Sequence, residues 1–172
     1  MKPGYVRAMD ALYLLCVAIA GFCIVVMTVV IPVGVFFRYV LNSALAWPEP
    51  AATLMMIFFT FFGGAACYRA RVHISVIVFV GLLVGDTAKK VAAHVVEVAV
   101  AALALFMLIW GAELATTTWH QVIAEFPWLL VGITYLPVPA AAFITLLFVL
   151  ERVWIGQPPP NSFIYREPPS VN

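Results

Sequence analysis

Hydrophobic residues follow one another in long runs, and the charged residues fall almost entirely between these runs. The first run extends over residues 11–37 without a charge, which exceeds the ~20 residues that a helix needs to cross a bilayer. Further runs over residues 51–68, 91–112 and 126–150 predict three more spans. The pattern therefore predicts an all-α integral membrane protein with four transmembrane helices.

A fifth apolar segment, residues 72–85, is too short to span. As a helix it would be only ~21 Å long, less than the ~30 Å of the hydrocarbon core. We expect a short interfacial helix there. Residues 157–172 are rich in proline and polar residues and are predicted to be a disordered tail, so the membrane domain covers residues 1–156.

The basic residues support four spans over five. With four, eight of the nine Lys and Arg residues lie on one side of the membrane and only Arg38 lies on the other. With five, the basic residues divide almost evenly. Lys and Arg collect on the cytoplasmic side of membrane proteins, so we predict four spans with both termini in the cytoplasm. The eight residues are Lys2, Arg7, Arg69, Arg71, Lys89, Lys90, Arg152 and Arg166.

The composition agrees with a protein that lies mostly in lipid. Only 10% of the residues are charged and 65% are hydrophobic, whereas soluble domains carry about 25% charged residues. The net charge of +1, without clustered basic surface, argues against a nucleic-acid partner. The sequence contains no serine-hydrolase, zinc-protease or phosphate-binding-loop motif, so we expect no enzyme activity.

His94 and Glu97 are an ionisable pair inside the third predicted span. Three positions apart, they share one helix face, and such a pair is a candidate for proton relay or ion coordination. Alternatively, Glu97 lies near the cytoplasmic interface and pairs with His94, with Lys89 or Lys90, or with a partner protein. No second acid lies nearby in the sequence to help hold a cation, which favours the structural interpretation.

Arg38 ends the first run and Glu49 follows a short loop later. Their opposite charges and similar expected depth predict a salt bridge between the first two helices; binding of an anionic substrate by Arg38 is the alternative. Trp47 is at the depth where membrane proteins collect interfacial aromatic residues. Gly63 and Gly64 form a small-residue patch of the kind that allows close helix packing.

A haem-binding redox anchor is a further alternative, because the chain has three histidines. Axial ligands should face one another at similar depth. His73 and His120 fall in loops on opposite sides and only His94 lies in a span, so the pattern does not favour this class. We expect no cofactor and no metal site.

Several short motifs follow one another in a definite order along the chain. The first span ends in Arg38-Tyr39 with Asn42, and the second opens with Trp47-Pro48-Glu49. Gly64-Ala65, Arg69 with Arg71, and His73-Ile74-Ser75-Val76 follow, and Pro127-Trp128, Tyr135 and Pro137 open the last span. This order resembles the small membrane subunit (Q, DctQ-type) of tripartite ATP-independent periplasmic (TRAP) transporters. The chain departs from that pattern at Pro50, where the family has a second Glu, and at Ile77, where an acid is frequent.

The resemblance implies a three-part, Na⁺-coupled secondary transporter of the bacterial inner membrane. A periplasmic binding protein would deliver an organic acid, and a large membrane subunit (M) would carry the substrate and Na⁺ sites. This chain would be part of the fixed scaffold beside M. The motif residues are then candidates for assembly, and Arg69 and Arg71 would also favour anionic lipid headgroups. The competing classes are a self-contained small transporter and a membrane anchor of a redox complex.

Overall fold

The computed structural model describes residues 3–43, 45–70, 86–124 and 126–155. Four helices within these ranges are long and apolar enough to cross a membrane, which confirms the all-α class with four transmembrane helices. The predicted interfacial segment 72–85 and the predicted tail 157–172 lie wholly outside the described residues. The elements are α1 (Pro3–Tyr39), α2 (Pro48–Ala70), α4 (Asp86–Thr117), β1 (Val122–Ile123), β2 (Phe126–Leu130), α5 (Val131–Tyr135) and α6 (Pro137–Ile155).

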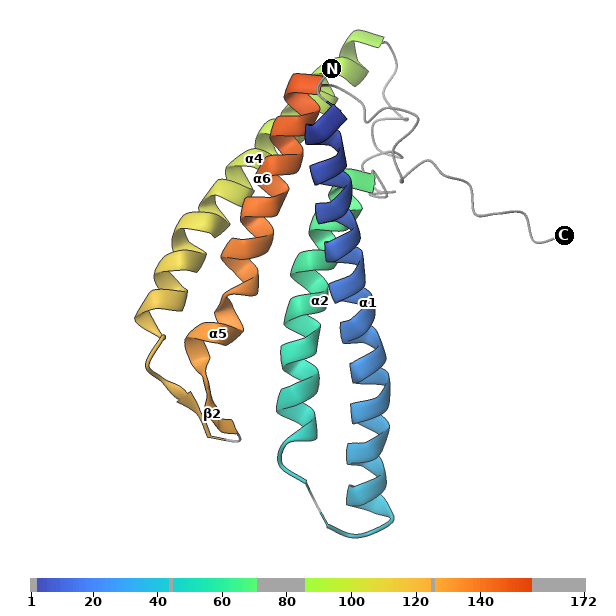
Figure 1. The fold of residues 1–172 in the computed structure, drawn as a ribbon, viewed down its shortest axis with the longest axis vertical. Coiled ribbons are helices and arrows are strands. Elements are labelled where there is room, and N and C mark those ends of the chain that lie inside the picture. The colour runs from blue at the N-terminus through green and yellow to red at the C-terminus, as the bar shows by residue number, and fades with distance from the viewer. Residues whose placement is uncertain (1–2, 44, 71–85, 125, 156–172) are drawn as a thin grey trace, which may run out of the picture.

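The long helices form two pairs (Figure 1). Helix α1 packs along α2, α4 packs along α6, and contacts between α2 and α6 join the pairs. The pairs converge at the end of the bundle where the chain begins. They diverge toward the other end, where the α1–α2 connection and the strands lie. The two ends of the bundle therefore differ in how closely the pairs are held together.

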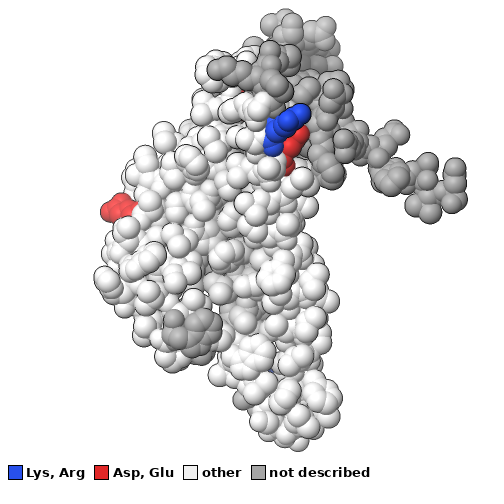
Figure 2. Space-filling view, in the orientation of Figure 1, with Lys and Arg blue, Asp and Glu red and all other residues white. Residues whose placement is uncertain are grey.

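Many of the side chains buried between the helices are small, beside larger ones such as Phe62 and Phe148, whereas many other large apolar side chains face outward. Cys16, Ala65 and Ala141 are buried, while Phe22, Val98 and Trp154 are exposed. Small residues at contacts allow close approach of helices in a membrane, where lipid can cover the large outer side chains. Figure 2 shows a face of the molecule with very few charged groups, most of them near the end where the chain begins.

The conformation of the chain after α1 explains why the motif has an asparagine at position 42. The helix continues through Pro32 and ends at Tyr39, and Asn42 then adopts a positive φ of 48°. The Ser43 N–H donates to the Phe37 carbonyl at 3.1 Å. Asparagine is one of the few residues that tolerate this left-handed conformation after a helix C-terminus. Asn42 therefore lets the chain turn toward α2.

The predicted start of the fourth span, at residue 126, is wrong. Residues 126–130 form β2, which pairs antiparallel with β1, with Val122 opposite Leu130. The spanning segment instead starts at Val131 and ends at Trp154. It is interrupted at Leu136, between α5 and α6. A short apolar run suits a strand as well as a helix, because hydrophobicity alone does not separate the two.

Gly132 determines how closely α5 approaches the end of α4. A Cβ atom at this position would lie 2.7 Å from the Ala115 carbonyl oxygen and 2.7 Å from Trp119 Cα. Both are backbone atoms, which cannot move aside as a flexible side chain can. The contact therefore requires glycine, and it holds α5 against the end of α4.

Candidate functional site: a buried arginine network and an outer groove

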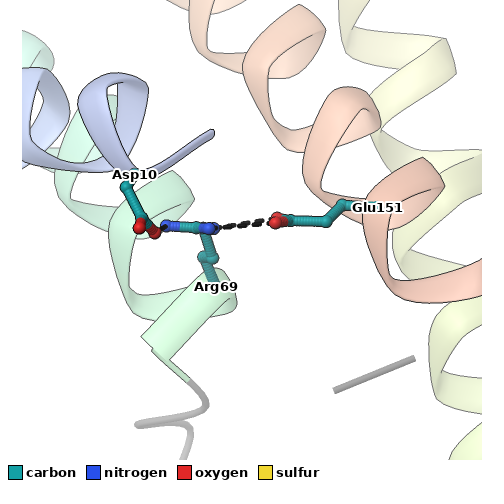
Figure 3. A network of polar contacts seen from close by, with 3 residues as sticks. All are labelled: Asp10, Arg69 and Glu151. Atoms are coloured by element: carbon teal, nitrogen blue, oxygen red, sulfur yellow. Dashed lines mark hydrogen bonds and ion pairs between the residues drawn. The ribbon is translucent and has the colours of Figure 1, made fainter. Parts of the chain in front are cut away.

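Arg69, near the end of α2, joins three helices at the convergent end of the bundle (Figure 3). Its Nε donates to Glu151 Oε2 at 2.9 Å and its Nη2 donates to Glu151 Oε1 at 2.9 Å. On the other side, its Nη1 lies 2.8 Å from Asp10 Oδ1. Asp10 belongs to α1 and Glu151 to α6, so one guanidinium links α1, α2 and α6.

The network is largely shielded from solvent. The side chains of Arg69, Glu151 and Asp10 are 2%, 5% and 20% exposed, respectively. The Arg69 guanidinium carbon also lies 5.8 Å from the ring centre of Tyr13 and 5.4 Å from that of Phe148. The planar, forked guanidinium suits a two-point contact with a carboxylate, and Lys cannot reproduce that geometry. The arrangement is therefore a structural clamp specific to arginine.

This burial corrects the expectation that Arg69 faces lipid headgroups. Its guanidinium points into the bundle, where two carboxylates neutralise it. Arg71 and His73 lie outside the described residues. The sequence interpretation did not identify Asp10 or Glu151 as partners, although each is the charge that bounds an apolar run at the same expected depth as Arg69. That shared depth was the available signal.

Glu97 pairs with Arg152, a partner that the sequence interpretation did not consider. Its Oε1 contacts Arg152 Nε, which joins α4 to α6. The two side chains are 22% and 26% exposed. The Arg152 guanidinium carbon also lies 5.7 Å from the ring centre of Tyr68 on α2. Glu97 thus contributes to the same end of the bundle as Arg69, while His94 lies on α4 one turn before it.

Arg38 and Glu49 do not form the predicted salt bridge: the ion pairs among the described residues are those of Arg69 and Arg152. Both side chains are exposed, and for such a pair water weakens the Coulomb attraction, while holding two flexible side chains in one geometry costs entropy. They nevertheless line one groove of about 400 Å³ between α1 and α2. Trp47, immediately before α2, is exposed.

The two glycines of α2 have different surroundings. A methyl group at Gly63 would lie 3.8 Å from Ala20 Cβ of α1, whereas nothing lies within 4 Å of the same position at Gly64. Ala65 and Ala66 are the buried small residues of this segment. The close packing expected of the patch therefore involves Gly63 and the two alanines.

The remaining motif residues surround the interruption of the fourth span. Pro127 and Trp128 lie in β2, Tyr135 ends α5, and Pro137 begins α6. Pro137 is fully buried. Proline suits the first turn of a helix, since the amide hydrogen it lacks would have no partner within the helix.

Four apolar helices, with a buried arginine paired to carboxylates of two other helices, define a multi-pass membrane protein whose described polar clusters hold helices together. Residues 27–156 match the family model of the DctQ component of tripartite ATP-independent periplasmic transporters. The match covers most of the chain, which therefore belongs to this family. No curated protein was found to match the sequence.

Proposed function

We propose that this chain is the small scaffold subunit of a TRAP transporter that imports organic acids across a bacterial inner membrane. The large membrane subunit carries the substrate and Na⁺ sites, and a periplasmic binding protein delivers the ligand. Both termini of this chain lie in the cytoplasm. The family match over residues 27–156 carries the proposal.

The described contacts support a fixed rather than a moving role. The Arg69 network and the Glu97–Arg152 pair join all four long helices at one end of the bundle. Breaking a buried ion pair is costly, because it leaves an uncompensated charge. A subunit held together in this way suits a scaffold beside which another subunit moves, and its exposed apolar side chains offer surface to a membrane partner or to lipid.

Copurification tests the proposal directly. The tagged full chain, expressed in its native host, is purified in mild detergent, and the copurifying proteins are identified by mass spectrometry. We expect a large polytopic subunit of the TRAP type. An unrelated tagged four-helix membrane protein is the control. Recovery with a haem-bearing subunit would instead support the redox-anchor class.

Transport by reconstituted proteoliposomes provides the second test. With an inward Na⁺ gradient and a panel of labelled organic acids, vesicles that contain only this chain should take up none of them. Vesicles that contain the chain, its copurified large subunit and the binding protein should accumulate the transported acid. Gradient-driven uptake by the chain alone would contradict the scaffold role.

A further inference from the structure

The groove between α1 and α2 combines two unpaired opposite charges with an apolar wall. Arg38 contributes the positive charge and Glu49 the negative charge, and the two are not joined in an ion pair. The volume of about 400 Å³ lies within the range of small-molecule sites. The apolar wall includes Met27, Ile31, Val35 and Met56.

The helix lengths place this groove at the edge of the membrane. Helix α2 has 23 residues and is about 34 Å long, close to the ~30 Å thickness of the hydrocarbon core. Glu49 lies in its first turn, two residues after Trp47. Tyr39, beside Arg38, is 74% exposed. Aromatic residues of this kind mark the level of the headgroups, so the charged end of the groove lies at that level and its apolar wall extends into the bilayer.

The backbone at the start of α2 offers an anion fewer amide hydrogens than most helix N-termini do. A helix N-terminus normally offers free amide hydrogens to an anion. Here Pro48 and Pro50 have none, and the Ala51 N–H donates to the Trp47 carbonyl at 3.1 Å. The guanidinium is therefore the positively charged group that the groove presents, and Glu49 is its acidic counterpart.

We propose that this groove binds one phospholipid with a zwitterionic headgroup that ends in a primary ammonium, as in phosphatidylethanolamine. The Arg38 guanidinium binds the phosphate, since its forked donors match phosphate oxygens. The Glu49 carboxylate accepts a hydrogen bond from the ammonium, and an acyl chain covers the apolar wall. A glycerol headgroup offers Glu49 no positive charge, and a choline headgroup offers it no N–H donor.

Native mass spectrometry of the full chain in detergent, titrated with dioleoyl lipids, tests the site. We expect the wild-type chain to bind phosphatidylethanolamine more tightly than phosphatidylglycerol or phosphatidylcholine. Arg38→Gln should weaken binding of all three lipids, by about tenfold, because each loses its charged phosphate contact. Glu49→Gln should remove only the preference for phosphatidylethanolamine. Soluble phosphoethanolamine at equal concentration should not compete, because it lacks the acyl chains.

Arg7→Gln and Glu113→Gln are the matched controls, because each removes an exposed charge of the same type outside the groove. Both should retain the wild-type lipid preference. Equal binding of the three lipids by the wild-type chain would overturn the proposal, as would a preference that survives Glu49→Gln. Loss of the bound lipid on assembly with a copurified large subunit would also overturn it, because a protein partner would then fill the groove. The lipid titration of the isolated chain gives its result whether or not the chain proves to be a transporter subunit.

Discussion

Replacing Arg69 by methionine should destabilise the isolated chain more than the loss of any exposed charge. Methionine has a long, flexible side chain and fills much of the same space, so the main change is electrostatic. The substitution removes both hydrogen bonds to Glu151 and the ion pair with Asp10. The variant therefore leaves two acids without their cation, one of them almost fully buried.

The expected loss in the free energy of unfolding is about 3–5 kcal/mol, the usual cost of removing one partner from a buried pair. A Coulomb estimate agrees, since opposite charges about 4 Å apart attract by ~4 kcal/mol at an effective dielectric constant near 20. We assign most of the loss to Glu151, whose side chain is 5% exposed. Asp10 is 20% exposed and can recover part of its hydration.

Reversible unfolding in mixed micelles, followed by helical circular dichroism, measures the change. Arg7→Met is the control; because Arg7 is exposed on α1, we expect a change within about 0.5 kcal/mol. The double variant Arg69→Met/Glu151→Leu should recover about 2 kcal/mol relative to Arg69→Met, because apolar residues can replace a buried pair at little cost. A single variant as stable as wild type, or a double variant less stable than the single one, would refute the reasoning.

Three further variants test local features in the same unfolding assay. Gly132→Ala should lower the free energy of unfolding by about 2–3 kcal/mol, because its Cβ would meet backbone atoms. Gly64→Ala should leave it unchanged in the isolated chain, because the position faces open space. Equal effects of the two variants would contradict this account. Asn42→Gly should leave stability unchanged, whereas Asn42→Val should cost about 1–2 kcal/mol, because a branched residue resists the positive φ. A valine variant as stable as wild type would show that the turn is not constrained. Glu97→Gln should cost at most ~1 kcal/mol, since the pair of Glu97 with Arg152 is partly exposed. A loss as large as that of Arg69→Met would mean that this pair stabilises the bundle as much as the Arg69 network does.

The hydrophobic runs were sufficient to predict four membrane-spanning helices, because bilayer thickness relates run length directly to structure. They did not locate the helix ends. Helix α1 already begins at Pro3, before the charged Asp10, since a helix can continue beyond the hydrocarbon core. The strand over residues 126–130 was missed because its apolar residues continue into the next helix without a charge to separate them.

The candidate site was predicted less completely than the fold. Arg69 was selected from its motif, but its partner Glu151 is 82 positions away, and no local pattern links the two. The reverse error occurred at Arg38 and Glu49, which are close in sequence and of opposite charge but are not paired. Proximity and charge sign favour an ion pair only when burial removes the competing water, and burial depends on how the helices pack.

The position of Glu151 in the last helix affects the order in which the bundle can be completed. During synthesis, Asp10 and Arg69 emerge with the first two helices, whereas Glu151 emerges only with α6. Until then, the Nε and Nη2 groups of Arg69 lack the carboxylate that they bind in the finished molecule. A chain that stops before α6 therefore retains an arginine without its main acceptor. An incomplete chain thus differs from a complete one by an arginine that has no carboxylate of Glu151 to bind.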